Sequence, residues 1–155
     1  MSQKKNLLVM LLLRLSVLVF SSCEKENGAN VKNISSHGSN ESHNMGKNCM
    51  ECHKSGGGGK GWFNIAGTVY DSTKLATLAN TTIKLYTEAN GGGQLKYTFE
   101  GDAKGNYYST DDVSFGDGLF PSVQGPTGTK YMSTSVKTGA CNSCHNVTTD
   151  KIWAK

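Results

Sequence analysis

The stretch Ile65-Ala66-Gly67-Thr68-Val69-Tyr70-Asp71 decides the fold class of this chain of 155 residues. It forms the C-terminal part of a run that begins at residue 62. In this run side chains of different character alternate with period two, and aromatic and β-branched residues are frequent, which is the pattern of a β-strand. Comparable runs, separated by Gly and Asn turns, lie at residues 81–87, 94–100, 106–110 and 130–137, with one or two weaker runs between 112 and 123. No helical period is found between residues 54 and 140, so we predict a mainly β chain with a small antiparallel β-sandwich over residues 61–138.

Three segments also carry a resemblance to a known family of domains. Ile65–Asp71, Thr82-Ile83-Lys84-Leu85-Tyr86 and Asp102-Ala103-Lys104-Gly105-Asn106-Tyr107-Tyr108 together resemble the carboxypeptidase regulatory-like, transthyretin-like β-sandwich. The resemblance covers residues 62–110. It implies a scaffold without catalytic residues, because a shared fold does not by itself carry a function.

Two copies of one five-residue motif bracket the predicted sandwich. They are Cys49-Met50-Glu51-Cys52-His53 and Cys141-Asn142-Ser143-Cys144-His145. C-x-x-C-H is the attachment motif of c-type haem: two thiols at this spacing add to the two vinyl groups of one macrocycle, and the following His becomes the proximal iron ligand. We therefore predict two covalently bound haem c groups, whose binding residues are Cys49, Cys52, His53, Cys141, Cys144 and His145.

Other uses of the same cysteines remain open at this point. Cys49, Cys52, Cys141 and Cys144 could form a Cys₄ zinc site, although a long segment separates the pairs and zinc would leave both histidines unexplained. Redox dithiols normally accompany a βαβ pattern, which this chain lacks. Two local disulfides are the third alternative.

Candidate distal ligands are few. Two of the four His residues are proximal, which leaves His37 and His43 together with Met45, Met50 and Met132. We predict His43 as one distal ligand, because Met45-Gly46 lets the chain double back towards either haem. Met132 is the candidate for the other haem, with packing in the sandwich as its alternative role. His37 is the alternative distal ligand and would give two bis-His haems.

The first 22 residues have the features of a signal peptide. Lys4 and Lys5 precede an apolar run from Leu7 to Phe20, which contains Arg14 and is too short to span a bilayer. Phe20-Ser21-Ser22-Cys23 resembles a bacterial lipobox with Phe in place of the usual aliphatic residue. The resemblance implies lipidation of Cys23, which also accounts for the one cysteine of five outside the haem motifs; ordinary cleavage that leaves a free Cys23 is the alternative.

The remaining segments complete the predicted organisation. Residues 23–47 are polar and predict a flexible tether behind the lipidated Cys23, residues 48–60 hold the first motif and a Gly56–Gly59 hinge, and residues 139–155 hold the second motif and a tail. The formal charge of +4 gives no support to a nucleic-acid partner, because three bases lie in the predicted leader.

As a whole the chain resembles small dihaem c-type cytochromes that a lipid tethers to a bacterial membrane. That resemblance implies an exported, non-enzymatic electron carrier, facing the periplasm or the cell surface, which serves redox proteins or extracellular acceptors. A haem enzyme with an open axial site, either a peroxidase or a small-molecule reductase, is the alternative, and a structural or sensory role is a third class.

The number of strands between the motifs predicts where the two haems lie. In an antiparallel sandwich seven strands would place them at opposite poles, which would suit self-association of copies into a stack. Six strands would place them together at one pole.

Overall fold

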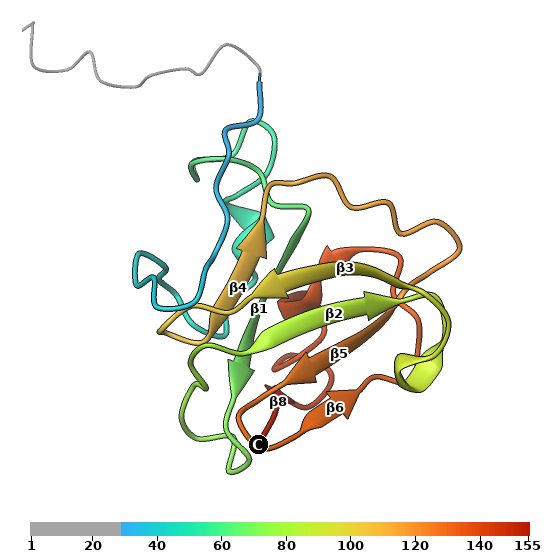
Figure 1. Ribbon diagram of the computed structural model, residues 1–155. Helices are drawn as coiled ribbons and strands as arrows, with labels where there is room; N and C mark the ends of the chain where they lie inside the picture. Colours follow the sequence, from blue (N-terminus) through green and yellow to red (C-terminus); the bar gives the residue numbers. More distant parts are fainter. Residues whose placement is uncertain (1–28) are drawn as a thin grey trace, which may run out of the picture.

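The computed structural model describes residues 29–155 (Figure 1). The predicted signal peptide, residues 1–22, and the predicted lipidation site Cys23 lie outside the described residues. Within the described part, no helix is long and apolar enough to cross a membrane.

Within residues 29–155, eight strands form two four-stranded sheets, which Figure 1 shows packed together. The first sheet has the order β4-β1-β7, with β8 also paired to β1, and contains β1 (Ile65–Tyr70), β4 (Asn106–Ser109), β7 (Gly139–Ala140) and β8 (Ile152–Trp153). The second has the order β3-β2-β5-β6 and contains β2 (Thr82–Tyr86), β3 (Leu95–Glu100), β5 (Phe120–Gln124) and β6 (Thr129–Tyr131). The predicted mainly β class is confirmed.

Antiparallel pairing dominates both sheets. The second sheet is antiparallel throughout. In the first sheet β1 and β4 are also antiparallel, with Gly67 opposite Tyr107. β7 and β8 add short parallel ladders to β1, each of two residues. The strand predicted over residues 130–137 is only partly present, because β6 ends at Tyr131 and the chain then crosses to a single bridge between Val136 and Leu119.

The core lies between the sheets. It is built from nine buried residues that both sheets and the C-terminal segment supply: Ile65, Val69, Ile83, Leu85, Phe99, Tyr107, Leu119, Val123 and Ala154. Every residue of β1 is buried, so this strand is covered on both faces. We call the side of β1 that carries Ile65 and Val69 its inner face, and the side that carries Ala66 and Thr68 its outer face.

The N-terminal segment packs along β4 instead of standing free. Ser35 N donates to Tyr108 O at 2.9 Å, and Ile34 forms a bridge with Ser109. β4 is the outermost strand of its sheet, so its backbone would otherwise lack partners. The predicted flexible tether of residues 23–47 therefore differs from the structure over residues 29–47, where the chain completes a sheet edge.

Candidate haem sites

The two C-x-x-C-H motifs fold into the same backbone turn. Each begins with a short 3-10 helix, η1 (Cys49–Glu51) in the first motif and η3 (Cys141–Ser143) in the second. The amide of His53 donates to Cys49 O at 2.9 Å, and the amide of His145 donates to Cys141 O at 3.0 Å. Two segments far apart in sequence thus hold their thiols and imidazole on equivalent backbones.

Both histidines are oriented through Nδ1. His53 Nδ1 lies 3.1 Å from Lys60 O and 3.2 Å from Gly61 O, and His145 Nδ1 lies 2.6 Å from Asp150 O. A carbonyl oxygen can only accept, so the proton belongs on Nδ1 and the Nε2 lone pair is left for a metal. Metal-binding histidines commonly have this second partner, which fixes the ring and its tautomer.

The structure describes the state of all four motif thiols. All four motif cysteines are free, so the structure contains neither of the two local disulfides. Over residues 29–155, no three or more His, Cys, Asp or Glu side chains are grouped so that they could hold one metal ion.

The first site lies on the outer face of β1 and is tightly packed. Cys49 and Met50 pack against a small cluster of Phe63, Ala66 and Tyr108. The ring of His53 stacks on Phe63 with centroids 4.1 Å apart and is only 8% exposed. The tetraglycine segment forms close turns beneath it, with Gly59 N donating to Cys52 O at 3.0 Å.

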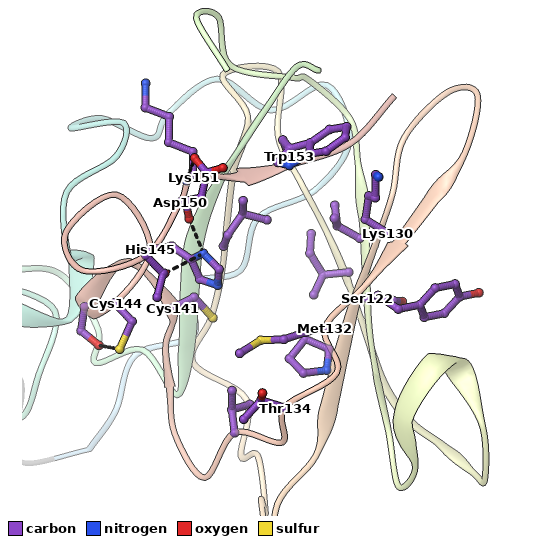
Figure 2. A pocket seen from close by; sticks show the side chains of 18 of the residues that line it. Ser122, Lys130, Met132, Thr134, Cys141, Cys144, His145, Asp150, Lys151 and Trp153 are labelled. Carbon is purple, nitrogen blue, oxygen red and sulfur yellow. Dashed lines mark hydrogen bonds between the residues drawn. The ribbon is translucent and has the colours of Figure 1, made fainter. Parts of the chain in front are cut away.

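The second site opens into a cavity of about 640 Å³ on the inner side of β1 (Figure 2). Cys141, Cys144 and His145 line one side, while Ile83 and Val123 contribute apolar wall from the second sheet. Burial raises the pKa of the Cys141 thiol to about 11. The volume falls within the range of ordinary cofactor pockets, so the residues present fit a haem here.

The structure brings each favoured distal candidate to a different motif. The His43 ring lies 5.9 Å from the His53 ring, centroid to centroid, at an interplanar angle of 35°. Two imidazoles on opposite sides of one metal have centroids about 6 Å apart, from metal–nitrogen distances of ~2 Å. Met132 reaches into the second cavity opposite Cys141 and His145 (Figure 2).

His37, the alternative distal candidate, is engaged elsewhere. Its Nε2 lies 3.1 Å from Thr81 O, and its amide donates to the Glu100 carboxylate. The described contacts of His37 therefore lie at the ends of β2 and β3, and none of them joins it to either motif.

The two motifs do not occupy opposite poles. Seven strands lead from the first motif to the second, yet η1 and η3 both contact β1, and Asn142 Nδ2 donates to Lys47 O at 3.0 Å. The two-pole prediction is therefore wrong. The segment between His53 and β1 is long enough to fold back along the strand, so strand parity does not determine where the first motif lies.

Sequence reasoning missed three residues that shape the sites. Asn142 is buried although it occupies a variable position of its motif, and Gly59 packs directly against the His53 ring. Tyr107 lies across Gly67, where any Cβ would collide with its ring, and burial raises the pKa of its phenol well above 10. Only the tetraglycine run gave a signal before the structure, because such a run allows close backbone approach.

Comparison of the chain with protein-family models, with curated proteins and with solved structures finds no match.

Proposed function

We propose that this protein is a membrane-anchored dihaem c-type cytochrome that transfers electrons outside the cytoplasm to redox proteins or extracellular acceptors. One observation supports it above the others: both motif histidines bond a backbone carbonyl through Nδ1 and keep Nε2 for iron, beside two free thiols. A bound haem would supply reversible one-electron chemistry, and the chain would supply attachment, ligation and environment.

Each residue has a defined role in this proposal. Cys49 and Cys52 attach one haem, Cys141 and Cys144 the other, and His53 and His145 are the proximal ligands. His43 is the distal ligand at the first site and Met132 at the second. Methionine ligation raises the reduction potential relative to histidine, so the second haem would be the better electron acceptor.

The anchor is also a proposal. Removal of residues 1–22 and lipidation of Cys23 would attach the chain to a bacterial membrane on its periplasmic or outer surface, with more than one acyl chain giving stable binding. Asn30 already bonds the backbone of Trp62 through both atoms of its side-chain amide, so the domain would stay close to that membrane. Self-association of copies and the absence of a nucleic-acid partner remain predictions of the same proposal.

Haem content tests the proposal directly. The full chain is expressed with export and c-type maturation machinery, and the purified protein is studied by intact mass and by a spectroscopic redox titration. We expect two covalent haems, and one haem in each of the double variants Cys49→Ser/Cys52→Ser and Cys141→Ser/Cys144→Ser. A colourless protein that binds zinc through all four thiols would contradict it.

The haem-enzyme alternative has one observation in its favour. The second motif faces a roomy cavity, in which Met132 is the only candidate ligand that we assign. If that axial position were open, carbon monoxide or cyanide would bind rapidly to the native protein. Inertness towards both ligands would favour electron transfer.

A further inference from the structure

Asn142 lies inside the second C-x-x-C-H motif, but its side chain is directed at β1 and at Lys47, just ahead of the first motif. It is 3% exposed. Its Oδ1 accepts from Thr68 N at 3.2 Å, and its Nδ2 donates to Thr68 Oγ1 and to Lys47 O, both at 3.0 Å. Both N–H donors of the Asn142 amide and one of its two acceptor positions are therefore used. The outer face of β1 and the segment that leads into the first motif thus fix the orientation of Asn142.

Thr68 is the centre of this buried network. Besides the bond from Asn142, its Oγ1 accepts from Gly46 N at 2.9 Å and donates to Asn106 Oδ1 at 2.6 Å. A hydroxyl has one donor and two acceptor positions, so Thr68 is fully satisfied. Valine has nearly the same shape but could make none of these bonds.

The network ends at the loop that carries His43. Asn106 Nδ2 donates to Ser42 Oγ at 2.9 Å and to His43 O at 3.4 Å. Residues 42–47 are therefore held from two directions: β1 and β4 bind Ser42, His43 and Gly46, and the second motif binds Lys47. Asn146, just beyond the second motif, adds a bond to Gly46 O at 3.4 Å.

The first motif has no counterpart of this arrangement. Met50 occupies the position that Asn142 holds in the second motif, and it packs on the apolar cluster around Phe63. Glu51, at the next position, is exposed. In these contacts the second motif and its flank supply the side chains, Asn142 and Asn146, and the segment ahead of the first motif supplies the backbone carbonyls of Lys47 and Gly46.

We propose that Asn142 is a positioning residue that couples the two sites: the turn of the second motif, through Asn142 and Thr68, holds loop 42–47 and so sets His43 beside His53. The proposal rests on the proposed function, since it assigns His43 to the first iron. It makes ligation at the first haem depend on a residue that contacts neither iron.

The decisive variant is Asn142→Ala, with Ser143→Ala as its matched control in the same turn. Ser143 is exposed, and its hydroxyl donates to Ala140 O, the residue just before its own motif. Holoprotein of each is studied by electron paramagnetic resonance and by redox titration. For Asn142→Ala we expect two haems, a loss of most of the first haem's bis-histidine signal and an unchanged second haem. Ser143→Ala should match the wild type.

Two comparisons separate positioning from a general loss of stability. His43→Ala should produce the same spectral change as Asn142→Ala, and the double variant should show no further change, because the two residues act in one chain of contacts. Thr68→Val should reproduce the change, whereas Thr68→Ser, which keeps the hydroxyl, should restore the wild-type signal even if Asn142→Ala proves difficult to fold.

The proposal is overturned if the first haem keeps its bis-histidine signal in Asn142→Ala or in Thr68→Val. It is equally overturned if Thr68→Ser is as altered as Thr68→Val. A wild-type protein without haem would instead contradict the proposed function, so the two failures are distinguishable.

Discussion

The two motifs share a turn and a histidine orientation, yet they lie in opposite surroundings. The first is pressed against the outer face of β1, where Phe63 covers the buried His53 and the His43 ring approaches it. The second borders an open cavity between the sheets, with His145 partly exposed and Met132 across from it. The five-residue motif therefore specifies the turn and the histidine orientation, whereas the strand face beside it specifies the environment.

If each motif binds a haem as proposed, this difference determines how the two groups would work together. Cys49 packs on the outer face of β1 with Ala66, and Cys141 packs on the inner core with Tyr107. The sites are separated by the thickness of one sheet instead of the length of the domain. On the proposed function, this short separation predicts electron exchange within one chain, from the site with two imidazoles to the site with Met132.

The largest expected effect concerns thiol reactivity in haem-free protein. Burial raises the pKa of Cys141 from 9.0 to about 11, which lowers its thiolate fraction near neutral pH by about a hundredfold, whereas Cys144 is exposed. Alkylation followed by peptide mass spectrometry should label Cys144 far sooner. Because only the thiolate reacts, the Cys141 rate should rise about tenfold per pH unit below pH 11. Equal alkylation rates of Cys141 and Cys144 in the folded protein would contradict the predicted difference between the two thiols. In denaturant the two rates should be equal, which is the control.

The next effect tests the close packing of the first site. In Gly59→Ala the new Cβ would lie 2.7 Å from His53 Cγ and Nδ1, whereas nothing lies within 4 Å of a Cβ at the neighbouring Gly58. Overpacking of this kind costs about 1–3 kcal/mol. We expect a lower midpoint of chemical unfolding and a changed first-haem spectrum for Gly59→Ala only. A Gly58→Ala variant with the same loss would mean that the His53 contact is not the cause.

A smaller effect is expected from the distal ligand of the second site. Met132→Leu conserves volume and removes the sulfur, so the cavity should persist while the ligand is lost. We expect the near-infrared charge-transfer band of Met-ligated ferric haem to vanish. The higher potential should fall by at least ~59 mV, which is a tenfold change in a one-electron equilibrium. If the band survives in Met132→Leu but disappears in Met45→Leu, the ligand has been assigned to the wrong residue.

The smallest effect concerns the rim of the cavity. Lys130 Nζ lies 3.9 Å from the centroid of the Trp153 ring, and both residues line the second site. Lys130→Met keeps the aliphatic stem and removes the charge, which should cost about 0.5–1 kcal/mol of cation–π attraction. Thermal unfolding and Trp153 side-chain resonances measure it, with Lys84→Met, away from the cavity, as the control. A first-haem response to Lys130→Met would show that the sites are less separate than the structure indicates.

Much of the architecture was predictable because strand periodicity is a local property. The patterns at residues 62–70 and 81–87 predicted β1 and β2; β1 begins three residues later than predicted, and β2 is one residue shorter at each end. β6 was overestimated: Met132 N still donates to Pro121 O of β5, but the chain then leaves the sheet until Val136 bridges Leu119, and no local pattern records that change of direction. The two-pole arrangement failed for a similar reason: a loop's length allows several return paths, and packing against β1 selects one of them.

The sequence by itself determined the mainly β class, the two thiol pairs and the histidine beside each, because strand alternation and C-x-x-C-H spacing follow from the geometry of a few neighbouring residues. Only the tertiary structure decided that both motifs flank β1, that His43 approaches His53, and that Met132 faces His145. It also decided that Asn142 of one motif holds the loop of the other. These relations join residues up to a hundred positions apart, and they exist only once the sheets have packed.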